Sequence, residues 1–195
     1  MVSYKSEEYD LLVIGAGPGG YVAAIRAAQL GKKVACVDKG PALGGTCLNI
    51  SCIPSKALLE SSHKYHEWST AMEVHGIKVA SVSFDLGAMM ARKDAIVKTL
   101  TSGIDFLCNK NMIARFLGIA CLLDNRSVQV AGETELNLRA KAILVAIGSM
   151  VATLPGVEID GTYIVSNTVA LAFTCVPKRL VVVGSGAIGL ELGSV

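Results

Sequence analysis

The first forty residues alternate between short apolar runs and one alanine-rich stretch of helical character. Residues 10–14 form a continuous apolar run that stops at a glycine, which is typical of a parallel strand buried on both faces. Residues 19–30 are rich in alanine and end before Gly31, a residue type that commonly closes a helix. Residues 33–37 form a second apolar run, which ends at Asp38. The pattern predicts a strand–helix–strand unit of about 30 residues.

The rest of the chain predicts two further helices, a group of short strands and a second copy of the opening pattern. Residues 41–45 are expected to form a loop, and a helix is expected over residues 54–68, because proline is tolerated in a first helical turn. Residues 85–109 predict a long helix with one apolar face. Short β runs follow at residues 112–118, 120–124, 127–132, 135–140 and 141–146. Residues 178–183 predict a strand that leads into glycines and a helix, so the fold class is α/β.

Composition narrows the function classes. Hydrophobic residues make up 52% of the 195 residues, and the net charge is +2. This balance gives no electrostatic reason to expect a nucleic acid or an anionic membrane as partner. No apolar run reaches the length of about 18 residues that crosses a bilayer. The acidic opening has no apolar signal region and no transit-peptide character, so we expect the cytoplasm, or an organelle matrix after processing.

Four of the six cysteines and all three histidines are expected to take no part in chemistry. Cys36, Cys121 and Cys175 lie in apolar or strand-like contexts, and Cys108 ends a helical pattern, so these four are expected to pack as small hydrophobes. The three histidines, His63, His66 and His75, are expected at the surface. Only Cys47 and Cys52 are close in sequence and have unusual neighbours.

A glycine motif joins the first predicted strand to its helix. Gly15, Gly17 and Gly20 form the pattern G-x-G-x-x-G. In such motifs the first glycine allows a tight turn, the second lets the backbone approach a pyrophosphate, and the third lets the helix pack closely on the sheet. Asp38, about 20 residues further on at the end of the second strand, is placed to accept from ribose hydroxyls. Together these features predict a dinucleotide site, and they do not separate FAD from NAD.

The second motif is the segment GGTCLNISCIPSK, residues 44–56. In a regular helix Cys47 and Cys52 would be about 8 Å apart, so the chain must bend between them if they are to meet. Pro54 then opens a helix with Cys52 near its N-terminus, where a thiolate is stabilised, and Lys56 adds a positive charge. The spacing favours a redox pair, with buried inert thiols as the alternative. It lacks the ligands of a zinc site, and no metal is expected.

These residues resemble the redox-disulfide signature of the pyridine nucleotide–disulfide oxidoreductases, which are flavoproteins. Among these enzymes, the sequence of the segment is most similar to that of the dihydrolipoamide dehydrogenases, because Ser55 precedes Lys56 where glutathione reductases usually carry two lysines. One position departs: the family usually has glycine where Ser51 stands. If that glycine uses a positive φ, the serine costs about 1 kcal/mol.

The resemblance implies roles for the redox residues. Cys47 and Cys52 would form the redox-active disulfide, with Cys47 as the interchange thiol and Cys52 on the flavin side. Lys56 would lie near the flavin N5 atom and form an ion pair with Glu191.

The resemblance also implies cofactor contacts. Gly45 and Thr46 would approach FAD, and Gly118 with Ala120 would bring backbone near its adenine. The family has an Ala-Thr-Gly segment on FAD that here reads Ala146-Ile147-Gly148-Ser149, so the threonine is missing. Gly184, Gly186 and Gly189 match the NAD site. FAD and NAD are therefore the expected cofactors.

On this resemblance, residues 1–150 form a Rossmann-like FAD-binding domain with a parallel sheet and a small β-meander. Residues 151–195 begin an NAD-binding domain that we expect to be truncated. The intact protein would be an oxidoreductase of cell redox homeostasis that oxidises dihydrolipoamide with NAD. It would serve 2-oxo acid dehydrogenase complexes and the glycine cleavage system as a homodimer, with dihydrolipoyl groups of acyltransferase or carrier proteins as partners. A glutathione or mercuric reductase, and a catalytically inactive fragment or binding subunit, are the alternatives.

Overall fold

The computed structural model describes residues 3–133 and 135–195, and the side chains from residue 8 onward in that range. The chain forms two compact units. The first comprises the chain up to Asn49 together with Thr99–Met150, and the second comprises Ile50–Lys98 and Val151–Val195. The break at residue 150 coincides with the boundary expected from the sequence, but residues 50–98 group with the second unit. The assignment of two cofactor domains stays a prediction.

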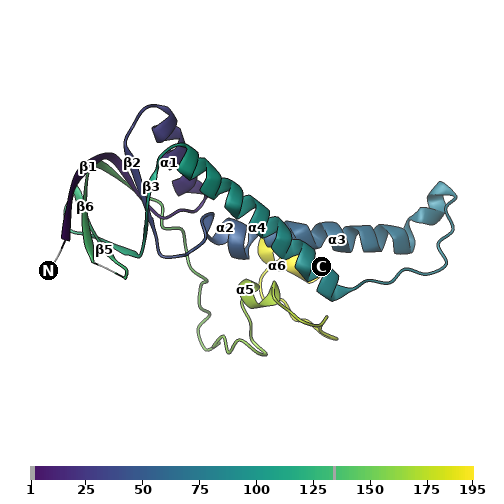
Figure 1. Ribbon diagram of the computed structural model, residues 1–195. Helices are drawn as coiled ribbons and strands as arrows, with labels where there is room; N and C mark the ends of the chain where they lie inside the picture. Colours follow the sequence, from purple (N-terminus) through teal and green to yellow (C-terminus); the bar gives the residue numbers. More distant parts are fainter. Residues whose placement is uncertain (1–2, 134) are drawn as a thin grey trace. The chain divides into compact units, whose positions relative to one another are not determined.

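The first unit is built on a six-stranded sheet of order β3-β2-β1-β6-β5-β4 (Figure 1). The pairs β1–β2, β2–β3 and β1–β6 are parallel, whereas β4–β5 and β5–β6 are antiparallel. A parallel sheet extended by a β-meander is the α/β fold class expected from the sequence. The strands are β1 (Ser3–Ile14), β2 (Val34–Asp38), β3 (Ala114–Leu117), β4 (Ile119–Leu122), β5 (Ser127–Ala131) and β6 (Leu136–Val145).

Strand β6 joins the two parts of this sheet. The sequence predicted two separate runs at residues 135–140 and 141–146, but the structure has one ten-residue strand. Its first residues pair with β5, and it pairs along its length with the long strand β1. A run that lies between two neighbouring strands has its backbone donors and acceptors satisfied on both sides, so no turn interrupts it.

The hydrophobic core of the first unit lies on the sheet. Leu12 and Val13 in β1 are both fully buried, as expected of a strand covered on both faces, whereas β5 alternates between buried and partly exposed residues. The buried cluster consists of Tyr9, Leu12, Ile14, Ala35, Val37, Val128, Val130, Leu138 and Ala140. Because β1 contributes to this core immediately before Gly15, the glycine turn begins from a rigid element.

Helix α1 (Pro18–Gln29) packs against β1 and β2 (Figure 1). It ends as predicted at Gly31, whose φ is +78°. The amides of Gly31 and Lys32 donate to the carbonyls of Ala28 and Ala27, which is the Schellman arrangement. The sequence missed the next helix, α2 (Gly45–Ile50), because its six residues include no helix-length apolar pattern.

The second unit is helical. It contains α3 (Cys52–Thr70), the 3-10 helix η1 (Met72–His75), α5 (Asn167–Ala170) and α6 (Ala187–Ser194). Helix α4 (Leu86–Lys110) begins in this unit and ends in the first. Both long helices predicted from the sequence are therefore confirmed.

Contacts within the second unit join its helices. Helix α6 lies against α3 and α5. Arg92 of α4 donates to the carbonyl of Ala57 (2.8 Å) and to the hydroxyl of Ser61, both in α3.

Two other expectations about this region were wrong. Residues 178–183 form no strand, and Val181 and Val183 are exposed, because a strand needs a partner and the described chain offers none there. On α4, Ile104 is buried, but Leu100 and Leu107 are exposed, so only part of the predicted apolar face is covered.

The isolated cysteines divide into two groups. Cys36 and Cys108 are buried, as predicted, whereas Cys121 and Cys175 are exposed, which corrects the expectation that they pack as hydrophobes. Cys121 lies on β4 at the edge of the sheet, where a strand has one neighbour only. The three histidines are exposed, as predicted.

Candidate functional site

The G-x-G-x-x-G motif forms the turn between β1 and α1. Gly15 has a φ of +99°, and a Cβ added there would lie 2.3 Å from the carbonyl oxygen of Ala146. A Cβ on Gly20 would lie only 1.7 Å from the carbonyl oxygen of Gly15. The tight turn and the close helix packing expected of these two glycines are therefore present.

Asp38, at the end of β2, stabilises this turn by hydrogen bonds. One carboxylate oxygen accepts from the amide of Ala16 at 2.5 Å, and the other accepts from the amide of Gly40 at 2.7 Å. The sequence had assigned this carboxylate to ribose. A carboxylate has about four acceptor positions, so the two bonds leave capacity for hydroxyls. The ribose contact stays a prediction, and the structure adds a role in holding two loops together.

A second glycine turn lies directly on the first. Gly44 and Gly45 have φ values of +103° and +57°, and the amide of Gly44 donates to the carbonyl of Ala16 at 2.9 Å. A Cβ on Gly45 would lie 2.6 Å from the Cα of Gly17. Only glycine permits this approach, and helix α2 starts from it.

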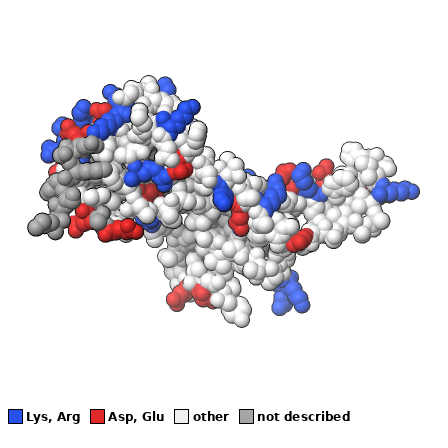
Figure 2. Space-filling model, viewed as in Figure 1, with Lys and Arg blue, Asp and Glu red and all other residues white. Residues whose placement is uncertain are grey.

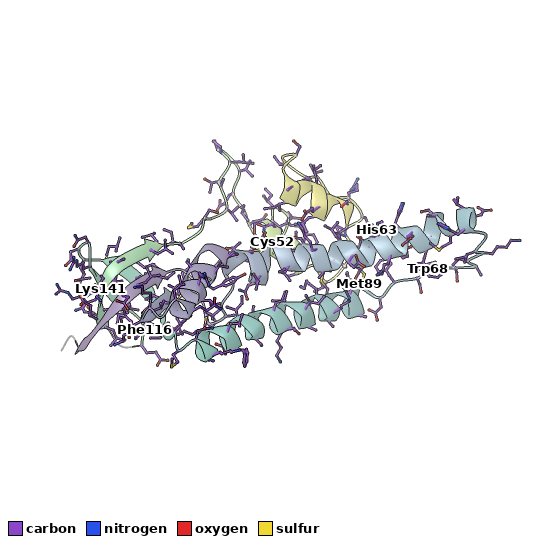
Figure 3. All side chains as sticks on the ribbon, turned by 90° about the horizontal axis from the view of Figure 1, so that it is seen from above. Cys52, His63, Trp68, Met89, Phe116 and Lys141 are labelled. Atoms are coloured by element: carbon purple, nitrogen blue, oxygen red, sulfur yellow. The ribbon has the colours of Figure 1, made fainter. Side chains whose placement is uncertain are left out.

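The two candidate redox cysteines belong to consecutive helices. Cys47 lies in α2 and is partly exposed, whereas Cys52 is the first residue of α3 and is exposed (Figure 3). The chain does bend between them, because α2 ends at Ile50 and α3 starts after Ser51. The pairing of Cys47 and Cys52 as a redox-active disulfide stays a prediction.

Ser51 does not carry the conformational cost that the sequence suggested. Its φ is −148°, outside the left-handed region, so no penalty for a side chain at positive φ applies here.

Lys56 lies on the first turn of α3, and its Nζ forms an ion pair with Glu191 of α6. The partner implied by the resemblance is thus the observed one. The lysine side chain is 60% exposed, so the pair contributes little to stability, and its value lies in directing the amine.

Hollows at the carboxyl ends of β2 and β3 adjoin the glycine turns. One of about 250 Å³ is lined by residues that include Cys36, Asp38 and Arg115. A larger one of about 860 Å³ is lined by Gly118 and also by Arg115. Sequence reasoning missed Arg115, since a lone arginine in a strand gives no signal of a pocket.

Burial raises the pKa of the Cys36 thiol to about 12, so this cysteine is a neutral group beneath the smaller hollow. Nearby Cys108 and Asp38 are smaller causes of this rise in pKa.

Gly118 is a corner between β3 and β4. Its φ is +155°, its amide donates to the carbonyl of Asp38 at 2.9 Å, and a Cβ there would lie 2.6 Å from the carbonyl oxygen of Ala131. Ala120 is paired with Val130 in the sheet and does not line the larger hollow. The structure therefore places Gly118, but not Ala120, at the hollow.

The segment after β6 passes the first glycine turn. The amide of Ala146 donates to the carbonyl of Ile14 at 2.8 Å, and its own carbonyl oxygen faces Gly15. Gly148 follows with a φ of +71°, and Ser149 is exposed. Thr46 is also exposed, at the start of α2.

The second glycine motif, in the second unit, repeats the first. Gly184 has a φ of +103°, close to that of Gly15, and Gly186 precedes α6 with a φ of −73°, as Gly17 precedes α1 with a φ of −71°. A Cβ on Gly189 would lie 2.9 Å from the carbonyl oxygen of Gly184. The turn-to-helix geometry is retained although the preceding strand is not formed.

Acidic and basic side chains are mixed over the face shown in Figure 2. Across the part of the chain that the structure describes, no helix is long and apolar enough to span a bilayer. In that same part, no three His, Cys, Asp or Glu side chains come together as a metal site would require.

Comparisons with known proteins agree with this geometry. The sequence profile of the family described as "Pyridine nucleotide-disulphide oxidoreductase" matches residues 9–195. Dihydrolipoyl dehydrogenase 2, mitochondrial, from Arabidopsis thaliana is 53% identical over 99% of this chain and 38% of its own length. The leghemoglobin reductase of Glycine max is 53% identical over 97% of this chain and 37% of its own length.

A solved structure, a Cu(II) complex of the HOCl-induced flavoprotein disulfide reductase RclA from Escherichia coli, superimposes with a TM-score of 0.79. It is 26% identical, and the match covers 95% of this chain and 39% of that one. The chain thus spans less than half the length of the relatives it matches. With the profile matching nearly its whole length, this chain belongs to the pyridine nucleotide-disulphide oxidoreductase family.

Proposed function

We propose that this chain supplies the flavin- and disulfide-bearing part of a dihydrolipoyl dehydrogenase. The intact enzyme oxidises dihydrolipoyl groups with NAD, through FAD and a Cys47–Cys52 disulfide. Dihydrolipoyl dehydrogenases of plants and of Schizosaccharomyces pombe, 51–53% identical to this chain, support the proposal.

One observation carries the proposal. The turn at Gly44 and Gly45, from which the Cys47-bearing helix starts, lies on the dinucleotide-type loop at Gly17. A redox cysteine is thereby built into the same fold element as the phosphate-binding turn. A dinucleotide-binding protein of another class does not require a redox cysteine beside its phosphate-binding turn.

The residues present fit FAD. At Gly15 and Gly45 a Cβ would meet backbone at 2.3 and 2.6 Å, whereas at Gly17 the absence of a Cβ leaves the backbone open to a ligand. The N-terminus of α1 offers amides to phosphate, and we assign Gly15, Gly17 and Gly45 to this contact. When bound, FAD would supply the chemistry that accepts an electron pair from the cysteine dithiol and delivers it to NAD. We assign Gly20, Asp38, Thr46, Gly118, Gly148 and Ser149 to the same cofactor, together with Ala120 by resemblance.

The chain's own residues carry the thiol chemistry. A thiolate of the substrate attacks Cys47 Sγ of the disulfide, forms a mixed disulfide and releases Cys52 as a thiolate. The second substrate thiolate then attacks the substrate sulfur of the mixed disulfide, which closes lipoamide and releases Cys47. Two electrons and two protons have then left the substrate, and both cysteines are reduced.

Two features of the second unit support the later steps. The amine of Lys56, directed by Glu191, supplies a positive charge four residues after Cys52, where it stabilises a thiolate. Gly184, Gly186 and Gly189 repeat the phosphate-binding geometry, and we assign them to NAD. On this proposal residues 1–150 belong to the FAD domain and residues 151–195 to the NAD domain.

The proposal extends to setting and partners. Several relatives are named as mitochondrial, so an organelle matrix is the compartment we favour for a eukaryotic source and the cytoplasm for a bacterial one. The partners are dihydrolipoyl groups of acyltransferase or carrier proteins, and the intact enzyme is a homodimer.

A chimera tests the function. This chain replaces the matching 38% of the Arabidopsis thaliana relative, and bound FAD and NADH formation from dihydrolipoamide are measured by absorbance. We expect turnover in the chimera. Cys47→Ser and Cys52→Ser should each lower turnover by a factor of about 1,000 or more, since the nucleophile or its partner is lost, while bound FAD stays unchanged.

Cys121→Ser is the matched control, because Cys121 is an exposed cysteine on β4, and turnover should be unaffected. A chimera that binds FAD but keeps its turnover in either Cys47→Ser or Cys52→Ser contradicts the proposal. A chimera that binds no FAD contradicts the assignment of the glycine turns.

A further inference from the structure

Asn49 makes two hydrogen bonds that neither the glycine motif nor the cysteine motif accounts for. Its side-chain nitrogen donates to the carbonyl of Gly45 at 2.9 Å and to the carbonyl of Leu43 at 3.1 Å. An amide NH₂ group has two donor hydrogens, so both are used within a single turn. Asn49 is the fifth residue of α2, and the bonds reach back to the start of that helix and to the residue before its glycines.

These bonds act where the chain needs them. Helix α2 has only six residues, far fewer than the roughly 12 that an isolated helix needs for stability, and both its first residue, Gly45, and the preceding Gly44 have positive φ. Neighbouring side chains hold the turn from beneath, since Leu43 and Leu48 are buried. Among the side chains whose hydrogen bonds the structure describes, Asn49 is the one that bonds to the backbone of this turn.

In sequence, Cys47 lies between the donor and the acceptor of the bond from Asn49 to Gly45. It is two residues after Gly45, which accepts one bond, and two residues before Asn49, which donates it. The turn itself is fixed on the first glycine loop by the bond from Gly44 to Ala16. Leu43 lies outside α2, so a rotation of α2 that moves Cys47 relative to that loop strains the bond from Asn49 to Leu43, while the bond from Asn49 to Gly45 keeps the first residues of the helix in place.

We propose that Asn49 is a positioning residue that fixes the orientation of Cys47 with respect to the glycine loop. Its importance for catalysis rests on the proposed function, in which Cys47 receives the substrate thiolate. Its effect on Cys47 itself does not depend on the reaction, and can be measured on the 195-residue chain.

The test is alkylation of the reduced chain by iodoacetamide, with each cysteine followed by peptide mass spectrometry from about pH 6 to about pH 10. Asn49→Leu keeps the approximate shape and removes both donors. We expect the rate at Cys47 to rise about fivefold, the effect of losing hydrogen bonds of ordinary strength. Cys121 in the same sample should keep its rate.

Asn111→Leu is the matched control. The Asn111 side chain donates to the carbonyl of Leu107 at 2.8 Å, a bond with the same four-residue spacing as the one from Asn49 to Gly45, at the end of α4. This variant should leave Cys47 unchanged. If Asn49→Leu unfolds the first unit, the buried Cys36 becomes alkylated, and Asn49→Ser takes its place. Serine is too short to reach Leu43, so Cys47 should respond in the same direction.

The proposal is overturned if Cys47 reacts alike in the native, Asn49→Leu and Asn49→Ser chains. It is also overturned if Cys121 changes as much as Cys47, because the effect would then be a general loss of stability. Neither result tests the proposed function, which depends on turnover by the chimera. Loss of turnover in the chimera in turn says nothing about the alkylation rate of Cys47, so the two proposals can fail independently.

Discussion

At the scale of single residues, the third glycine of the motif has the least room. Gly20 and its neighbour Gly19 lie in the same turn of α1, but a Cβ on Gly20 would meet the carbonyl oxygen of Gly15 at 1.7 Å. A Cβ on Gly19 would meet only the Cβ of Ala146, at an ordinary 3.8 Å. The pair therefore separates the effect of a methyl group from the effect of its position.

We expect Gly20→Ala to lower the free energy of unfolding of the chain by about 1–3 kcal/mol, because the added methyl forces the backbone apart. Gly19→Ala should raise it by about 0.5–1 kcal/mol, since alanine is favoured over glycine inside a helix. Urea unfolding followed by circular dichroism measures both. Equal stability of the two variants would mean that the close approach to Gly15 is absent in solution.

Met112 is the only described residue other than glycine with a positive φ, at +55°. It closes α4 in a Schellman arrangement, in which its amide donates to Asn109 and the amide of Ile113 donates to Cys108. The methionine side chain is 89% exposed and contributes little packing. Met112→Gly should therefore raise the midpoint of urea unfolding, by about 0.5–1 kcal/mol in stability, after the greater freedom of glycine in the unfolded chain is subtracted.

Val74→Gly is the control for this prediction. Val74 is as exposed as Met112 but has no positive φ, so its replacement should not stabilise the chain. A destabilised Met112→Gly would show that the methionine side chain makes contacts the exposure does not suggest.

At the scale of elements, sequence patterns succeeded where a local cause determines the structure. The glycine turn after β1, the Gly31 stop of α1 and the two long helices each follow from residues that are close in sequence. Helix α2 was missed because tertiary contacts at Gly17 and the side chain of Asn49 sustain it. Strand β6 was divided in two because pairing with β1 and β5, which lie far away in sequence, makes it continuous.

The candidate site shows the same division. The glycines, Asp38, the two cysteines, Lys56 and Glu191 could be named from motifs. Arg115 at the hollows could not, since only the fold brings its neighbours near. Asn49 could not either, since its bonds to Leu43 and Gly45 depend on the backbone path of a turn that the sequence predicted as a plain loop. The predicted strand at residues 178–183 failed for a related reason, because a strand depends on a partner rather than on its own apolar run.

Lys93 joins two helices of the second unit. This lysine is buried, and its Nζ donates to the carbonyl of Leu171 at 2.9 Å and pairs with Asp94 at 3.1 Å. Leu171 is the C-cap of α5, and is itself buried. Lys93 thus ties α5 to α4.

We expect Lys93→Met to lower the free energy of unfolding by about 1–3 kcal/mol, because a buried carbonyl loses its donor. Protease cleavage within residues 160–175 should become faster. Lys64→Met, which removes an exposed pair with Glu60 on α3, should change stability by less than about 0.5 kcal/mol. If both variants were cleaved at the native rate, α5 would be held by other contacts.

At the scale of the whole molecule, the buried thiol of Cys36 makes stability depend on alkaline pH. Burial is the largest cause that raises its pKa from the ordinary 9.0 to about 12 in the folded chain, and nearby Cys108 and Asp38 are smaller causes of the same rise. The folded state therefore keeps a proton that the unfolded state releases above about pH 9. The contribution is fully present below pH 9 and is lost as the pH rises from 9 towards 12, at up to about 1.4 kcal/mol per pH unit.

Burial also raises the pKa of Cys108, so the two thiols act in the same direction. Cys36→Val fills a similar volume without an ionisable group, and should make the free energy of unfolding fall less steeply between about pH 9 and about pH 11. Urea titrations at several pH values measure the slope. Cys121→Val, on the exposed edge strand β4, should keep the native slope. A native slope in Cys36→Val would mean that the alkaline loss of stability arises elsewhere, since removal of the ionisable group must remove its share of the proton release.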